Sequence, residues 1–173
     1  IEAIQAVPSR YQFPSRYLLA TGSGKTLIQN TLALMAFHAA IENQSVFIVT
    51  PQIELVNQLY RDLINYNNDL RERQDPLCIS NEAILKVSSH EQSIALKLFL
   101  KNESVQNESS IVICCADSFQ NLLAEDPKLV ESAALVLFDE YHVYQPLMQN
   151  VCDSISEQGP ITIASSATPP KHD

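Results

Sequence analysis

The chain has 173 residues, of which 46% are hydrophobic and 18% charged, so its composition is that of one globular domain and not of a disordered chain. Its 20 acidic and 11 basic residues give a net charge of −9, which argues against the uniformly basic surface typical of nucleic-acid binders. No apolar run reaches the roughly 18 residues of a membrane-spanning helix and no secretory signal is present, so we expect no membrane partner.

Apolar runs alternate with helix-forming segments along the chain. Residues 1–7 resemble the end of a helix that Pro8 stops, and the absence of a starting methionine leads us to expect a longer parent protein. Strands are predicted at residues 17–20, 46–50, 111–115, 134–138 and 161–164, with shorter candidates at 77–80 and 85–87. Helices are predicted at residues 25–41, 53–66, 91–100, 117–124 and within 144–157, and loops at 65–75 (or a fraying helix end) and 101–110.

This alternation predicts βαβ units, and hence an α/β fold with a mostly parallel central sheet and helices on both of its faces. The helix at residues 25–41 is apolar around much of its circumference, so we expect it to be largely buried. Asp117 is the expected cap of the helix at residues 117–124.

The four cysteines suggest neither a zinc site nor a disulfide framework, because none of them forms a C-x-x-C pair and two adjoin in an apolar run. We expect reduced, mostly buried thiols and an intracellular, cytoplasmic protein, with the nucleoid or nucleus as alternatives. The four are Cys78, Cys114, Cys115 and Cys152.

A glycine-containing loop stands between the first predicted strand and the first predicted helix. Glycine exposes backbone amides, which together with the helix N-terminus can point at one anion. Lys25 would place its charge on the terminal phosphates, and the Thr26 hydroxyl would coordinate Mg²⁺. Leu19 replaces the first glycine of the strict phosphate-loop pattern, yet every group that touches phosphate or metal is present, which predicts a nucleoside triphosphate site. The loop residues are Ala20, Thr21, Gly22, Ser23, Gly24, Lys25 and Thr26.

Two further groups of polar residues follow predicted strands. Asp139 and Glu140 come directly after the apolar strand at residues 134–138, where Asp139 can hold Mg²⁺ and Glu140 can deprotonate the water that attacks the γ-phosphate. His142 is a third catalytic candidate. After the last strand, the small hydroxyl residues can hydrogen-bond His142 or the carboxylates; they are Ser165, Ser166 and Thr168.

Together these motifs resemble the first RecA-like domain of superfamily 2 helicases, in the branch of the DEAH-like and type III restriction enzymes. The matching segments are the loop at residues 20–26, the Walker B residues 139–142 and the coupling residues 166–168. The resemblance implies a RecA-like P-loop domain over residues 1–173, ATP and Mg²⁺ as cofactors, catalytic roles for Lys25, Glu140 and His142, and coupling roles for Ser166 and Thr168. Tyr141 departs from the family's usual alanine or cysteine, and we expect its ring to pack without loss of catalysis.

The resemblance also implies a DNA or RNA partner and a second RecA-like lobe of the same parent chain. Backbone and hydroxyl groups after the strands can bind phosphates with few lysines, which reconciles this partner with the net charge of −9. The second lobe supplies arginines to the γ-phosphate, so we expect weak hydrolysis from this chain alone. The residue that reads adenine would precede Ile1. The positions that match nucleic-acid contacts are Thr50, Gln52, Asp117 and Ser118.

Two alternatives stay open at this point. The chain can be a P-loop ATPase of another class, such as one that remodels proteins, or a helicase-like scaffold that binds partners without turnover. The sequence does not separate DNA from RNA, or unwinding from translocation.

Overall fold

The computed structural model describes residues 15–18, 24–41, 44–88, 109–140 and 159–166, together with Val143 and Pro146. Its strands form one six-stranded sheet in the order β1-β6-β5-β2-β4-β3, and every pair of neighbours is parallel. The strands are β1 (Ser15–Leu18), β2 (Ser45–Thr50), β3 (Ile84–Val87), β4 (Ser110–Cys115), β5 (Leu135–Asp139) and β6 (Ile161–Ser166).

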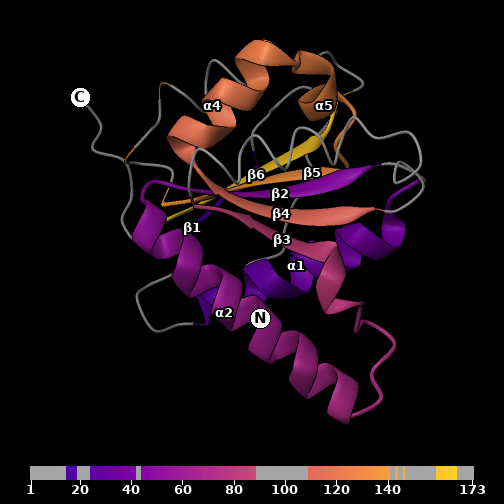
Figure 1. The fold of residues 1–173 in the computed structure, drawn as a ribbon. Helices are drawn as coiled ribbons and strands as arrows, with labels where there is room; N and C mark the ends of the chain where they lie inside the picture. Colours follow the sequence, from indigo (N-terminus) through magenta and orange to yellow (C-terminus); the bar gives the residue numbers. More distant parts are fainter. Residues whose placement is uncertain are drawn as a thin grey trace.

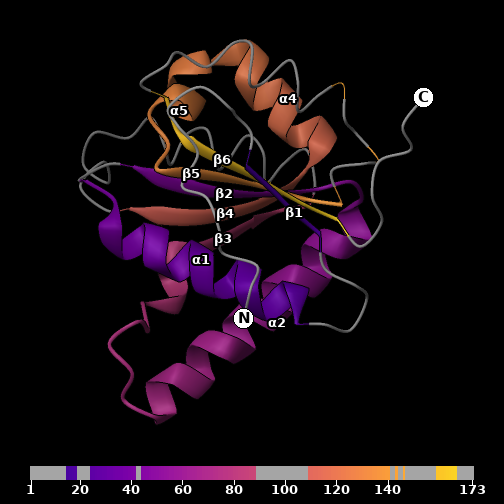
Figure 2. The same ribbon diagram turned by 180° about the vertical axis from the view of Figure 1, so that it is seen from behind.

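Helices cover both faces of this sheet, which confirms the predicted α/β architecture. In Figures 1 and 2, α4 and α5 lie on one face, and α1 and α2 lie on the other. The helices are α1 (Lys25–Ala39), α2 (Ile53–Glu72), α4 (Ala116–Glu125) and α5 (Pro127–Glu131), and a short 3₁₀ helix spans Asn81–Ala83. None of the helices in these described ranges is both long and apolar enough to cross a membrane.

The core consists of two apolar clusters, one on each face of the sheet. Phe47 and Phe138 point toward α4, where each meets Phe119 edge-on, with ring centroids 5.5 and 5.9 Å apart. Alternate residues of the same strands, such as Ile48, join the cluster beneath α1 and α2, which also contains Leu63. Burial on both faces explains why the central strands are continuous apolar runs.

Helix α2 is longer than predicted, because the polar stretch after residue 66 has its own hydrogen bonds. Asn67 is buried, and its side chain donates to the carbonyl of Ile79 (3.0 Å) and accepts from the amide of Ile79 (2.9 Å). Leu70 is also buried in the core. The helix therefore continues to Glu72, and the predicted strand at residues 77–80 is wrong, since the backbone of Ile79 pairs with a side chain and not with a strand.

The predicted cap at Asp117 is also wrong. Helix α4 already begins at Ala116, so Asp117 lies in its first turn and is exposed, and Cys115 takes the capping position. The short helix α5, which starts with Pro127, was not predicted from the sequence. The predicted helices at residues 1–7 and 91–100, and that within 144–157 apart from Pro146, lie outside the described residues.

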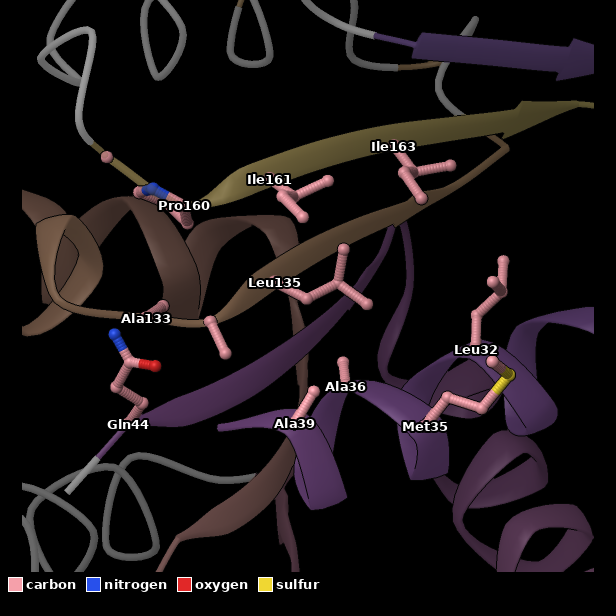
Figure 3. A pocket seen from close by; sticks show the side chains of 12 residues that line it. Leu32, Met35, Ala36, Ala39, Gln44, Ala133, Leu135, Pro160, Ile161 and Ile163 are labelled. Carbon is pink, nitrogen blue, oxygen red and sulfur yellow. The ribbon is translucent and has the colours of Figure 1, made fainter. Parts of the chain in front are cut away.

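Helix α1 is not largely buried, contrary to the prediction. Its side toward the sheet buries Ala33 and Leu34, whereas Ile28 and Met35 remain 39% and 53% exposed. Figure 3 shows Met35 beside an apolar cavity of about 430 Å³ that is also lined by residues at the start of β5 and β6, such as Leu135. The cavity thus lies at the amino ends of these strands, away from the ends that carry Asp139 and Ser166.

Candidate functional site

The strand order brings the ends of β1, β5 and β6 together. Strand β6 lies between the other two, with Ser166 in register with Leu18 of β1 and Ser165 in register with Asp139 of β5. Because all three strands are parallel, their carboxyl ends meet at one edge of the sheet, where ligands bind in open α/β folds. The end of β1, the acidic pair at the end of β5 and the hydroxyl residues that end β6 therefore lie at one edge of the sheet.

Gly24 directly precedes α1, and the structure describes it together with Lys25 and Thr26 of the loop. It occupies the position before α1 with φ 89° and ψ 18°, a left-handed conformation. A Cβ atom at Gly24 would meet nothing within 4 Å, so backbone conformation and not space requires glycine here. Ala20, Thr21, Gly22 and Ser23 lie outside the described residues.

Lys25, the first residue of α1, contacts both residues of the acidic pair. Its Nζ lies 3.0 Å from Asp139 Oδ1, with 16% and 7% of the two side chains exposed, and it also donates to Glu140 Oε1. Burial by itself lowers the pKa of Lys25, but the hydrogen bonds and negative charges of Glu140 and Asp139 outweigh it and raise the pKa above 10.5. Lys25 is therefore charged at neutral pH, as phosphate binding requires.

Glu140 has an unusual backbone conformation at the end of β5. Its φ is 51°, in the left-handed region that costs an ordinary residue about 1 kcal/mol. The amide of Val143 donates to its carbonyl at 3.0 Å. Strained residues of this kind cluster at functional sites, and here the strain falls on the residue predicted to be the general base.

The donor set at this edge suits Mg²⁺. Asp139 is buried and Thr26 is half-buried in the first turn of α1, and a carboxylate and a hydroxyl are hard oxygen ligands. Mg²⁺ bound with a nucleotide commonly takes only one or two protein oxygens, because phosphates and waters supply the others. Thr26 and Asp139 are therefore the residues that would hold the ion.

The edge also contains a buried glutamine that the sequence analysis did not single out. The Nε2 of Gln29 lies 2.8 Å from both Asp139 Oδ1 and Ser165 Oγ. Ser165 Oγ is itself 3.2 Å from Asp139 Oδ1, as predicted for the hydroxyl residues after the last strand. The one signal for Gln29 was its polar side chain in a helix that the sequence analysis expected to be largely buried. Ser166 is buried at the end of β6, and His142 and Thr168 lie outside the described residues.

The predicted nucleic-acid positions lie at the same edge of the sheet, after β2 and β4. These two strands are adjacent, with Thr50 in register with Cys115. The Thr50 side chain is buried and donates to the Gln52 carbonyl (2.9 Å), whereas Gln52 and Asp117 are exposed. Ser118 Oγ lies 3.3 Å from Cys115 Sγ. Contact of any of these four with nucleic acid stays a prediction.

Comparisons with known proteins agree with this fold. A family model described as DEAD/DEAH box helicase matches residues 15–173. A comparison with curated protein sequences gave no significant match.

Several solved structures resemble the chain. The helicase domain of Hef from Pyrococcus furiosus has a TM-score of 0.64 and 18% identity, over 92% of this chain and 31% of that one. A second similar structure is a nuclease-deletion mutant of the Type ISP restriction-modification enzyme LlaGI in complex with a DNA substrate mimic. It has a TM-score of 0.63 and 16% identity, and the match covers 92% of this chain and 16% of that one. The UvsW helicase from bacteriophage T4 has a TM-score of 0.58 and 16% identity, and the match covers 90% of this chain and 46% of that one. The chain thus spans less than half the length of each of these structures.

Proposed function

Because the chain belongs to the DEAD/DEAH box helicase family, we propose that it is the ATP-binding lobe of a helicase or translocase that couples ATP hydrolysis to movement on DNA or RNA. The family implies an ATP hydrolase in general. The observation that carries the proposal is the placement of Lys25 between Asp139 and Glu140, at the sheet edge where the phosphate loop ends.

In this function each residue of the site has a distinct task. Lys25 exchanges its carboxylate partners for the phosphate oxygens of ATP, beside the loop of residues 20–26 and the N-terminus of α1. Thr26 and Asp139 would hold Mg²⁺, which when bound would neutralise negative charge on the phosphates. Glu140 orients the attacking water and accepts its proton.

The remaining predicted residues serve catalysis and communication with the rest of the protein. His142 would be a third catalytic residue after β5, and Ser166 and Thr168 would transmit the state of the nucleotide to the strand-binding surface and to a second RecA-like lobe. Thr50, Gln52, Asp117 and Ser118 would line the path of a DNA or RNA strand at the same edge. We propose that residues 1–173 form a single lobe, with an intracellular location.

The second candidate function is a P-loop ATPase or helicase-like scaffold that acts on proteins. The net charge of −9 favours it, since a nucleic-acid partner would usually select a more basic protein. Both functions use the same ATP chemistry, so only the dependence on nucleic acid separates them.

The experiment is a steady-state ATPase assay of the full-length protein at low salt, with and without single-stranded DNA or RNA. A helicase or translocase should be stimulated by at least one of the two strands. Stimulation by neither, with measurable basal hydrolysis, would reject the helicase function in favour of the second candidate. The chain of residues 1–173 alone should bind ATP but hydrolyse it slowly, because arginines from a second lobe accelerate such reactions by about 10³–10⁵-fold.

A further inference from the structure

Gln29 is a buried amide at the centre of the site. It lies on α1, one helical turn after Lys25, and is only 1% exposed. Its Nε2 faces Asp139 Oδ1 and Ser165 Oγ, each at 2.8 Å. An ionised carboxylate accepts hydrogen bonds and cannot donate them, so the amide nitrogen and not the oxygen must face Asp139.

The three side chains form a closed and self-consistent network. The two N–H groups of Gln29 serve Asp139 and Ser165, and the Ser165 hydroxyl can then donate to Asp139 Oδ1 at 3.2 Å or to the Phe138 carbonyl at 3.4 Å. This network connects α1 with β5 and β6. Its contact on β6 is Ser165, the residue directly before Ser166. A network of this kind fixes the orientation of a carboxylate.

Nucleotide binding should break the contact of Lys25 with Asp139 but leave the contacts of Gln29 and Ser165 in place. Lys25 contacts the same Oδ1 at 3.0 Å, but under the proposed function Lys25 turns to the phosphates. The contacts of Gln29 and Ser165 do not involve groups that phosphate recruits. They can therefore keep Asp139 oriented when Lys25 leaves it.

The oxygen of the same amide gives a second, independent indication. Among the residues that the structure describes, Gln29 Oε1 is the buried side-chain atom without a hydrogen-bond partner. A buried acceptor left unpaired is costly, and a water molecule bound to Mg²⁺, which is a hydrogen-bond donor, would satisfy it in the loaded site. Mg²⁺ usually keeps several of its waters.

We propose that Gln29 is a positioning residue of the nucleotide site, which holds the Asp139 carboxylate for Mg²⁺ and joins it to the end of β6 through Ser165. This inference rests on the proposed function, because it assumes that the site binds a magnesium nucleotide. Gln29 acts through Asp139 and does not itself touch the reacting phosphate.

The test is a Mg²⁺ titration of the affinity for a fluorescent ATP analogue, with EDTA as the metal-free reference, in the purified chain. Gln29→Met keeps the length and volume of the side chain but removes both N–H donors. Because partners of metal ligands typically contribute about 10–100-fold to metal affinity, we expect this variant to lose Mg²⁺ affinity by that factor. Its affinity for the analogue in EDTA should not change.

Asn30→Leu is the matched control, since Asn30 is a buried amide on the same helix, 4% exposed, and it makes no hydrogen bond to Asp139 or Ser165 within the described residues. It should keep the wild-type Mg²⁺ dependence. If Gln29→Met does not fold, Ser165→Ala decides: reduced Mg²⁺ affinity supports the network, and wild-type affinity overturns it.

The outcomes separate this inference from the proposed function. A wild-type chain that binds no nucleotide would overturn both. Binding by the wild type with the same Mg²⁺ dependence in Gln29→Met would overturn only the role of Gln29. An equal loss of affinity in EDTA and in Mg²⁺ would also overturn it, because it would show a general structural defect.

Discussion

Replacement of Lys25 by methionine should both destabilise the chain and abolish nucleotide binding. Coulomb's law gives about 5 kcal/mol for unit charges 3.0 Å apart, as Lys25 Nζ and Asp139 Oδ1 are, at an effective dielectric constant of about 20. Desolvation of the charges offsets most of this gain, so the net loss should lie between the roughly 1 kcal/mol of exposed pairs and the roughly 3–5 kcal/mol of broken buried pairs. We expect about 1–3 kcal/mol, because the side chains of Lys25 and Glu140 remain 16% and 24% exposed.

Thermal unfolding measures this loss. For a chain of this length, 1 kcal/mol corresponds to about 2–4 °C in Tm, so Lys25→Met should unfold several degrees below the wild type at pH 7. Lys86→Met is the control, because Lys86 contacts Asn57 (2.9 Å) and the Tyr60 ring, away from this edge. It should leave nucleotide binding unchanged.

The pH dependence gives a further check on the cause. The acidic pair raises the pKa of Lys25 above 10.5 in the folded chain, so the stabilisation is fully present below about pH 10.5 and is lost as the pH rises through the folded value. The difference in Tm between Lys25→Met and the wild type should therefore shrink at strongly alkaline pH. Equal Tm values at pH 7 would refute the stabilising role of the ion pairs.

Four other outcomes follow from the structure. Glu140→Gln should retain ATP binding in the full-length protein and lower kcat by about 10²–10⁴-fold; normal turnover would show that another residue is the base. Gly24→Ala should lower the free energy of unfolding by about 1–2 kcal/mol, measured by urea titration, because its φ is 89°. Gln74→Gly should raise the free energy of unfolding by about 1 kcal/mol, since Gln74 has φ 56° after the end of α2. An unchanged midpoint of the urea titration would argue against strain at Gln74. Burial raises the pKa of the Cys114 thiol, so native protein should react with a thiol reagent at the half-buried Cys78 well before Cys114.

The sequence by itself determined the features that are written in neighbouring residues. The central strands could be predicted because burial on both faces requires continuous apolar runs, such as residues 46–50. The turn into α1 at Gly24 could be predicted because the glycine, Lys25 and the start of the helix are adjacent in the chain, and its binding of phosphate stays a prediction. The alternation of these strands with helices was enough to predict the parallel α/β sheet.

Only the tertiary structure decided which distant side chains meet. Helix α2 continues to Glu72 because Asn67 bonds the backbone of Ile79, a contact that no local pattern encodes. The strand order placed β6 between β1 and β5, and the packing of α1 against β5 brought Gln29 within 2.8 Å of Asp139, 110 residues further along the chain. A polar residue in a helix is ambiguous by itself, because its role depends on the strand ends that the sheet places beside it.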